Sequence, residues 1–540
     1  MFAFLHGYHP LLWQPQVDAG LVNDGDGIRF CQSKLIADDL KFNRLAAKGG
    51  ELYQILSERK CPFYIDRLQG GCYIDDYVYD QGLLAEYRTL LGENFWGFQM
   101  HEWLSNYRSD LQKLDKLDTD RWTQAEIERT IFGKFPFPCI FLESMTAEEM
   151  AAAGKPKTVA EFYRAMTAIY RKRMAEVGDL IPCDSAFLAY PFELAVGTKR
   201  IVPEVGAQTA DARVQVCYAR GMAKAYGRTF GVYYEPWGGS PFSACCYQRN
   251  GKNEWGIGES SDFPFETAGE NGGSSRSLQM RIFLYAYFSN AEFLSEEWGL
   301  CNVFTDWESF ALSPYGQTKR EFQQFVRRYP DVGEKLTPIA AVLPKHLTVL
   351  EEIDSPGIFL GYAVDPDVQT VLAKAKGGVR CLFGTATPMQ GTEQKTLINS
   401  LIPDSLDLVN DGAGDLSTYD FLVDLTDDPR FAARHPNTCA IDDVPAKLKT
   451  LLPCWVEGNV HWMVNRRIGG GYYLAIFNHS GVVRSVADGE YTLPEADEPV
   501  AVLFSPDAEP QLCEGGVSLE KHGERYHLTV PAGGWCLIRF

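Results

Sequence analysis

The amino-acid sequence lacks the features that mark a membrane protein or a nucleic-acid-binding protein. No apolar run approaches the roughly 18 residues that a membrane-spanning helix needs. Basic residues are scarce too: the 540 residues include 51 Lys and Arg against 71 Asp and Glu, a net charge of −20. Because nucleic acids and anionic membranes attract clusters of basic side chains, we expect neither as a partner.

Motifs for metal and cofactor binding are missing as well. The 14 cysteines form no C-x-x-C pair, and Cys245 is followed directly by Cys246, a spacing that suits neither a zinc site nor a simple disulfide. His101 and Glu102 begin an H-E-x-x-H pattern that Ser105 breaks, and no G-x-G-x-x-G follows the first expected strand. We therefore expect no metal ion and no cofactor.

Reduced thiols diluted over a long chain are typical of a cytoplasmic protein. The N-terminal residues show no basic segment followed by an apolar core, so we expect no secretory signal and a cytoplasmic location. Aromatic side chains, in contrast, are plentiful, at 13% of residues with 11 Trp and 26 Tyr. Aromatic faces stack on sugar rings but also fill large cores, so the count alone decides little.

Short apolar runs alternate with amphipathic helical stretches over the first part of the chain, to about residue 330. The strand candidates are residues 2–8, 27–33, 61–68, 95–103, 138–144, 200–206, 229–239 and 291–299. A long helix is expected over 158–178, and Asp184 with Ser185 is expected to cap another over 186–197. Eight β-α repeats predict a (β/α)8 TIM barrel. A doubly wound sheet is the alternative, but the sequence lacks the glycine-rich motif that is typical of that fold.

The pattern changes twice after Pro338. Strands and short helices alternate to about residue 450, which predicts a flavodoxin-like α/β domain, and period-2 strands with Gly-rich turns then predict a β-sandwich. The expected division is a catalytic barrel over 1–335, a flavodoxin-like domain with a role in oligomerisation over 336–453, and a β-sandwich over 454–540.

Glutamates close five of the expected barrel strands, where a barrel of this kind places its chemistry. They are Glu102, Glu143, Glu204, Glu235 and Glu297, the last preceded by Glu296. Three of them have a tryptophan within two residues, namely Trp103, Trp237 and Trp298. A single such glutamate is as easily a polar exit to solvent. Repeated pairing of carboxylates with indole rings favours glycosidic cleavage, in which one carboxyl group donates a proton and another attacks or stabilises the sugar centre.

The order of a barrel, a small flavodoxin-like domain and a C-terminal β-domain resembles family 42 β-galactosidases and the related family 164 β-mannosidases of glycoside hydrolase clan A. The resemblance covers the whole chain as architecture. It implies a retaining exo-glycoside hydrolase that acts on an oligosaccharide or glycoside with a β-linked galactose or mannose, and a homotrimer. It also implies an acid/base Glu at the end of strand 4 and a nucleophile Glu at the end of strand 7, about 5.5 Å apart.

Counting strands backward from 291–299 as strand 8 makes 138–144 strand 5, Glu102 the acid/base and Glu235 the nucleophile. The count can slip by one. If 186–190 is a strand, Glu143 takes the acid role, and if 337–344 closes the barrel, Glu297 becomes the nucleophile. The clan has Asn before the acid/base, whereas this chain has His101, which can donate the same bond to a sugar 2-hydroxyl.

Other strand-end residues are candidates for substrate binding. Asp66 suits a contact to two sugar hydroxyls, with Arg67 beside it, although an ion pair that fixes a loop fits them equally well. One of Tyr233 and Tyr234 faces inward by alternation. The residues assigned to substrate binding are Asp66, Arg67, His101, Trp103, Asn106, Glu204, Tyr234, Trp237 and Trp298.

His6 and His9 are interpreted as loop histidines, because no third metal ligand is evident. The Gly/Ser/Glu-rich segment 251–276 is a candidate lid over the barrel, with a solvated insertion as the alternative. A carbohydrate-binding protein on a barrel scaffold and a different barrel enzyme, such as a metal-dependent lyase or isomerase, remain alternatives to a glycosidase.

Overall fold

The computed structural model describes most of the chain, and every structural statement below refers to that part. The described residues are 2–31, 45–66, 80–101, 158–184, 189–206, 212–235, 248–249, 255–256, 275–297, 303–345, 358–359, 362–363, 366–384, 396–485 and 489–540. Among them, no helix combines the length and the apolar character that crossing a membrane requires.

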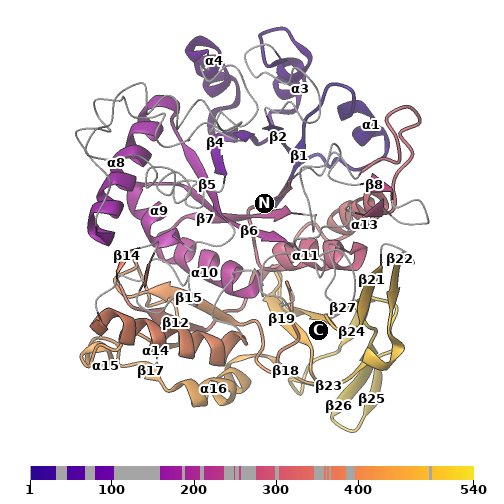
Figure 1. Cartoon of the computed structure of the whole chain (residues 1–540). Helices are drawn as coiled ribbons and strands as arrows, with labels where there is room; N and C mark the ends of the chain where they lie inside the picture. The colour runs from indigo at the N-terminus through magenta and orange to yellow at the C-terminus, as the bar shows by residue number, and fades with distance from the viewer. Residues whose placement is uncertain are drawn as a thin grey trace.

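Eight parallel strands close into a barrel in the first part of the chain (Figure 1). They are β1 (Ala3–Gly7), β2 (Gly27–Cys31), β3 (Phe63–Asp66), β4 (Phe95–His101), β5 (Leu180–Asp184), β6 (Arg200–Gly206), β7 (Thr229–Glu235) and β10 (Phe293–Glu296). Each strand pairs with the next, and β10 returns to β1. The expected (β/α)8 barrel is confirmed.

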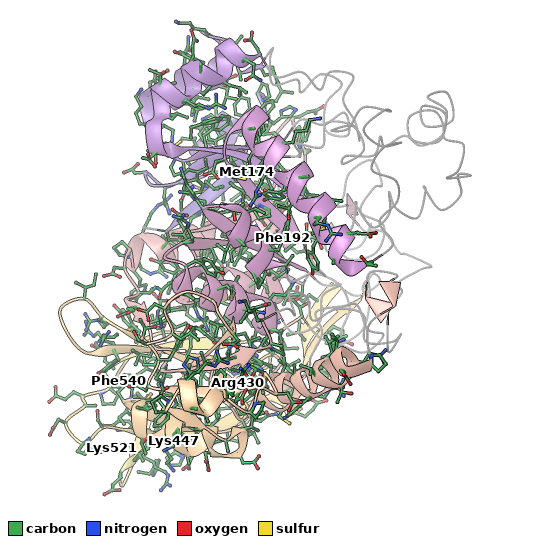
Figure 2. The ribbon with its side chains drawn as sticks, turned by 90° about the vertical axis from the view of Figure 1, so that its left-hand side faces the viewer. Met174, Phe192, Arg430, Lys447, Lys521 and Phe540 are labelled. Atoms are coloured by element: carbon green, nitrogen blue, oxygen red, sulfur yellow. The ribbon has the colours of Figure 1, made fainter. Side chains whose placement is uncertain are left out.

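Helices follow the barrel strands and cover the outside of the barrel. They are α1 (Trp13–Asp18), α3 (Glu51–Arg59), α4 (Gln81–Leu91), α8 (Val159–Val177), α9 (Tyr190–Val196), α10 (Ala212–Ala225), α11 (Arg276–Phe288) and α13 (Pro314–Arg328). Side chains that accept a backbone N–H fix several helix starts, as Thr158 does for α8 and Ser275 for α11. Figure 2 shows α8 with Met174 and α9 with Phe192 on the flank of the barrel. Phe192 meets the ring of Tyr170 edge to face there.

The barrel interior is packed rather than open. Its central cluster consists of Ala3, Leu5, Tyr64, Trp96, Ile181, Cys183, Val202, Tyr233 and Phe293. Gly231 makes room for the Phe293 ring, because a Cβ at position 231 would lie 2.3 Å from that ring. A filled interior confines any binding site to the strand ends.

The fifth strand differs from the expectation. Strand β5 is Leu180–Asp184, so the prediction that 138–144 forms strand 5 is wrong. The prediction that Asp184 caps a helix is also wrong, because Asp184 ends β5 and α9 begins after Ala189. The apolar run in β5 is short and contains Pro182, which weakens a strand pattern in a sequence.

The middle part of the chain forms a second parallel sheet. Its strands are β12 (Ile339–Leu343), β15 (Leu406–Asn410), β16 (Phe421–Asp424) and β17 (Thr438–Cys439), in the order β15-β12-β16-β17. Its helices are α14 (Pro366–Phe383), α15 (Phe431–Arg434) and α16 (Val444–Leu451), and a two-stranded ribbon joins β13 (Ile358–Phe359) to β14 (Tyr362–Ala363). This second-first-third-fourth order is the flavodoxin-like one. Because β12 belongs here, 337–344 does not close the barrel.

Two antiparallel sheets form the C-terminal part, mostly orange to yellow in Figure 1. One has the order β11 (Glu334–Lys335), β19 (His461–Arg466), β20 (Tyr472–Phe477), β27 (Trp535–Arg539) and β24 (Gln511–Glu514). The other has β18 (Cys454–Glu457), β23 (Glu498–Phe504), β26 (Arg525–Val530) and β25 (Glu520–His522), and β21 (Val482–Ser485) pairs with β22 (Gly489–Thr492). Strand β11 precedes the middle sheet in sequence, so the chain contributes to the C-terminal sheet twice.

The barrel, the middle sheet and the C-terminal sheets share one large core. Helix α10 packs directly on β15, where a Cβ at Gly221 would lie 2.2 Å from the carbonyl oxygen of Leu408. A close backbone contact of this kind requires glycine and fixes the middle sheet against the barrel.

Candidate active site

The carboxyl ends of the barrel strands bring several of the expected residues together. Asp66 ends β3, His101 ends β4, Glu235 ends β7, and Glu204 lies near the end of β6. Glu297 follows β10 directly, and its backbone N–H donates to the carbonyl oxygen of Tyr234 at 2.8 Å. All five residues are at most 5% exposed.

Three glutamates from neighbouring strands converge in this mouth. One oxygen atom from each of Glu204, Glu235 and Glu297 lies within 4.8 Å of the others. The strand register explains the convergence, because Gly206 pairs with Glu235 and Glu296 pairs with Tyr234. Like charges placed so close in a buried site are typical of catalytic or metal-binding positions.

His101, at the end of β4, lies close to two of these glutamates. Its Nε2 atom is 3.5 Å from Oε1 of Glu204 and 3.4 Å from Oε1 of Glu297. The side-chain amide of Gln99 lies 3.5 Å from the other ring nitrogen. His101 thereby links strand β4 to the ends of β6 and β10.

A second set of contacts crosses the barrel interior between β7 and the neighbouring strands β2 and β3. Nη1 of Arg29 lies 3.0 Å from Oδ2 of Asp66 and also donates to the hydroxyl of Tyr233. That hydroxyl donates in turn to Asp66 at 3.4 Å, and the Tyr233 ring meets the His101 ring edge to face. A charged pair buried this deeply is stable only with such additional hydrogen bonds.

Arg29 is a site residue that the sequence analysis missed. It stands between Ile28 and Phe30 in a strand that is buried on both faces. A charged side chain in such a strand needs a partner inside the barrel. The single Arg between apolar residues was therefore a signal that the sequence itself contained. An ion pair of Asp66 with Arg67 was one of two interpretations of the sequence. Arg67 lies outside the described residues, and among those Asp66 pairs with Arg29.

Tyr233 and Tyr234 face opposite sides of β7. Tyr233 lies inside the barrel, whereas Tyr234 packs on the ring of Phe283 in α11 with the centroids 5.9 Å apart. The prediction that Tyr234 binds the substrate is therefore wrong, because its side chain faces away from the barrel interior. Tyr233 is the tyrosine that faces inward. The same alternation turns Glu296 outward, where Lys319 of α13 donates to it at 2.8 Å.

Several expected residues lie outside the described part of the chain. They are Arg67, Glu102, Trp103, Asn106, Glu143, Trp237 and Trp298, together with most of segment 251–276. The strand count is nevertheless settled by the barrel. Strand β4 is the fourth and is followed directly by Glu102, β7 is the seventh and ends in Glu235, and Glu297 follows the eighth. Neither slip in the count occurs, because the fifth strand is Leu180–Asp184, which pairs with β4, and because β12 lies in the middle sheet.

Two overlapping groups in the mouth have the composition of a metal site. One is Glu204, Glu235 and Glu297, and the other is His101, Cys183 and Glu204. Carboxylate oxygens alone suit a hard divalent cation such as Mg²⁺, Ca²⁺ or Mn²⁺, whereas a His, Cys and Glu set suits Zn²⁺.

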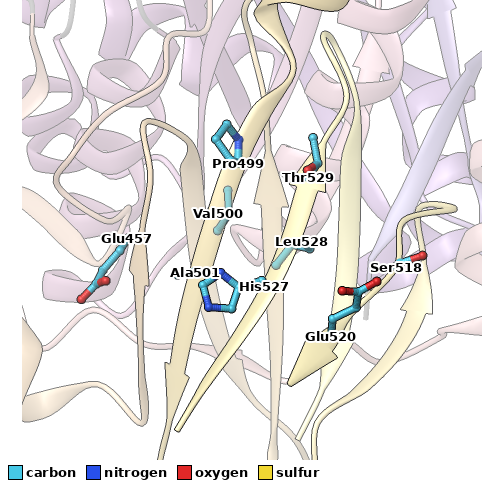
Figure 3. Close-up of a pocket in the computed structure, with 9 residues that line it drawn as sticks. All are labelled: Glu457, Pro499, Val500, Ala501, Ser518, Glu520, His527, Leu528 and Thr529. Carbon is cyan, nitrogen blue, oxygen red and sulfur yellow. The ribbon is translucent and has the colours of Figure 1, made fainter. Parts of the chain in front are cut away.

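Two pockets lie away from the mouth. One, of about 520 Å³, lies on the four-stranded C-terminal sheet over β18, β23, β26 and β25 (Figure 3). The other, of about 530 Å³, runs along α13 between α11 and the C-terminal sheets. Neither contains a residue of the mouth.

No protein-family model matches the chain, and no curated protein matches it in sequence. Solved structures that are similar over the whole chain include an α-L-fucosidase from Paenibacillus thiaminolyticus, at 11% identity over 100% of this chain and 99% of that one, with a TM-score of 0.45. A β-galactosidase from the Antarctic haloarchaeon Halorubrum lacusprofundi has 10% identity, coverage of 100% and 99%, and a TM-score of 0.41.

The catalytic module of a family 98 glycoside hydrolase from Streptococcus pneumoniae has 8% identity, coverage of 100% and 98%, and a TM-score of 0.41. Similarity at this level carries no information on activity. The function therefore has to follow from the site.

Proposed function

We propose that this protein is a retaining exo-glycoside hydrolase that cleaves a β-linked galactoside or mannoside, with Glu235 as nucleophile and Glu102 as acid/base. The observation that carries the proposal is the position of Glu235. It ends the seventh barrel strand, is 1% exposed, and lies among the inward-facing groups of the mouth. Glu102 follows the fourth strand in the sequence, and β5 and β6 separate that strand from β7 in the barrel.

The reaction needs two steps. In the first, the Glu102 carboxylic acid gives its proton to the glycosidic oxygen while the Glu235 carboxylate attacks the anomeric carbon, and the leaving group departs as an alcohol. In the second, the Glu102 carboxylate takes a proton from water, whose oxygen attacks the same carbon and releases Glu235. Two inversions retain the β configuration.

The remaining mouth residues suit the binding of a neutral sugar. Asp66 accepts hydrogen bonds from sugar hydroxyls, and Arg29 and Tyr233 hold its carboxylate in place. His101 takes the position before the acid/base from which it donates to the 2-hydroxyl.

Nitrophenyl glycosides test the activity, and azide tests the two residues separately. The wild type should release nitrophenol from a β-galactoside or a β-mannoside, with β-sugar as the first product by NMR. In Glu235→Ala, azide should restore turnover and yield an α-glycosyl azide, because it attacks from the side of the missing nucleophile. In Glu102→Ala, it should yield a β-glycosyl azide. A wild type that cleaves no glycoside, or two variants that keep full activity, contradicts the proposal.

A metal-dependent barrel enzyme is the second candidate, favoured by the two ligand groups around Glu204. It predicts that a chelator abolishes turnover and that a divalent cation restores it. The glycosidase mechanism predicts turnover that is indifferent to the chelator. A homotrimer and a cytoplasmic location are further proposals, and light scattering on the purified protein measures the oligomeric state.

A further inference from the structure

Two aromatic side chains meet at the rim of the barrel, on loops that the glycosidase mechanism does not use. His9 follows β1, and Trp307 lies in the loop between β10 and α13. Strands β1 and β10 are neighbours in the barrel, so both loops leave the same sector of the mouth. The two ring centroids are 5.1 Å apart. In Figure 1 the pink loop that carries Trp307 runs beside the indigo helix α1.

The loop that carries Trp307 is built as a rigid turn. The Asp306 carboxylate accepts the backbone N–H groups of Glu308 and Ser309 at 2.9 and 2.6 Å, and also the Ser309 hydroxyl. These hydrogen bonds lower the pKa of Asp306 to about 2, so the carboxylate stays charged. Below the turn, Phe304 pairs with Leu312.

The base of this loop is anchored in a small apolar cluster. Val303 and Phe304 pack with Leu12 and Leu21 from the segment after β1. Trp307 is 37% exposed even so. A large aromatic side chain held in place and left open to solvent offers a binding face that loses little freedom when a ligand binds.

His9 adds a hydrogen-bond donor to this aromatic face. Its Nδ1 atom accepts the backbone N–H of Leu11 at 3.1 Å, and burial lowers the pKa of the ring, so the neutral ring carries its hydrogen on Nε2. His9 is 3% exposed, and its Nε2 atom has no hydrogen-bond partner among the described residues. A buried N–H group without a partner is costly unless a ligand or water completes it.

We propose that His9 and Trp307 form the subsite for the leaving-group sugar of the substrate. An indole face and one N–H donor are the chemistry that recognises a sugar ring, through its C–H groups and one hydroxyl. The sugar that is cleaved has to reach the buried Glu235, whereas Trp307 stands at the rim. In an exo-enzyme the part of the substrate that extends outward is the leaving group. This inference rests on the proposed function.

The test compares two substrates of the wild type and of Trp307→Ala. One is a β-linked disaccharide of the sugar that the nitrophenyl panel identifies, and the other is the β-glycosyl fluoride of the same sugar, which has no leaving-group ring. Trp307→Ala should lower kcat/KM for the disaccharide about 10-fold, the range expected for one lost aromatic contact, and leave kcat/KM for the fluoride unchanged. Trp307→Phe should keep most of the disaccharide activity.

His9→Gln retains a side-chain donor, so its kcat/KM for the disaccharide should lie between the values of the wild type and of His9→Ala. Leu11→Ala is the matched control, because Leu11 is 62% exposed on the same loop. It should leave kcat/KM unchanged for both substrates. An equal loss on both substrates in Trp307→Ala overturns the inference but leaves the glycosidase standing. A wild type that cleaves neither substrate overturns the proposed function and this inference with it.

Discussion

Two buried sets of charged residues in this molecule are organised in opposite ways. At the barrel mouth, Glu204, Glu235 and Glu297 bring three acidic groups together, with one oxygen of each within 4.8 Å of the others. Behind the barrel, around Asp404, opposite charges alternate. Asp404 lies 3.2 Å from Nζ of Lys335 and 3.4 Å from Nη2 of Arg220, and Arg220 also binds Asp407 at 2.6 Å.

The residues around Asp404 come from all three sheet systems. Arg220 lies on barrel helix α10, Asp407 lies in β15 of the middle sheet, and Lys335 and His461 lie in the C-terminal sheet. The opposing charges hold the pKa of Asp404 well below its usual range, with Lys335 the largest of the lowering causes against the effect of burial. Burial lowers the pKa of Lys335 itself, to about 8.

A directed chain of hydrogen bonds extends these contacts to helix α11. Arg281 has only donors, so it donates to Nδ1 of His479, whose Nε2 then donates to Nδ1 of His461, and Nε2 of His461 donates to Asp404. Burial lowers the pKa of His461 to about 4, so its ring is neutral near pH 7. The first and last links join segments that are distant in sequence, whereas His461 and His479 lie 18 residues apart, in and next to the paired strands β19 and β20.

The comparison separates what stabilises the fold from what serves the reaction. Alternating charges from three sheet systems stabilise their association, and removing one leaves another buried without its partner. Like charges from adjacent strands oppose folding and are typical of a site kept for its chemistry. The following experiments test this contrast.

Replacement of the mouth carboxylate Glu235 by Gln should have the largest effect, and on activity alone. We expect kcat to fall about 1,000-fold or more, because a neutral amide does not attack the anomeric carbon. The melting temperature should stay the same or rise, since one of three close carboxylates is gone. Nitrophenyl glycoside kinetics and calorimetry measure the two quantities. A clear fall in melting temperature would assign Glu235 a structural role.

Replacement of Asp404 by Ala should lower the stability of the fold, in contrast to the loss of activity expected for Glu235→Gln. We expect a loss of about 3–5 kcal/mol in the free energy of unfolding, because Lys335 and Arg220 remain buried. Chemical denaturation of the folded chain gives this value. The control is Asp411→Ala, which breaks the partly exposed pair with Arg434 and should move the midpoint little. Equal effects of the two substitutions would refute the structural role of Asp404.

Acid should weaken the contacts around Asp404. Burial lowers the pKa of His461 from 6.5 to about 4. Between these values the unfolded chain binds a proton at this histidine and the folded chain does not, so stability is full above pH 6.5 and falls as the pH drops toward 4. The loss should be about 3 kcal/mol, at about 1.4 kcal/mol per pKa unit.

Denaturation midpoints measured from pH 7 to pH 4 test this loss. The fall of the midpoint with decreasing pH should become smaller in His461→Gln. It should persist in His522→Gln, whose ring is exposed. A wild-type slope that persists in His461→Gln would assign the acid sensitivity to other groups.

The smallest expected effect is a difference in kcat/KM between phenylalanine variants of two adjacent tyrosines. Tyr233→Phe removes a hydroxyl that contacts Arg29 and Asp66, and should lower kcat/KM about 10- to 100-fold, the value of a hydrogen bond to a charged group. Tyr234→Phe changes a ring that packs outside the barrel and should leave kcat/KM close to wild type. Steady-state kinetics on one glycoside compare them. If Tyr234→Phe lost more activity, the inner and outer faces of β7 would be assigned wrongly.

The sequence was sufficient for those parts of the fold that depend on local patterns. Apolar runs and helix caps gave seven of the eight barrel strands, and the alternation of strands and helices gave the type of the second sheet. Strand β5 was missed because four apolar residues with a proline are a weak local signal, and the closure of the barrel supplies what that segment lacks.

At the mouth, the sequence by itself determined which strands end in carboxylates, because residue type at a strand end is a local property. Only the tertiary structure decided that Tyr233 and not Tyr234 faces inward and that Asp66 meets Arg29 across 37 residues of chain. The same holds for Asp404, which brings three sheet systems together. Such contacts depend on strand register and on packing between distant segments, and no local pattern encodes either.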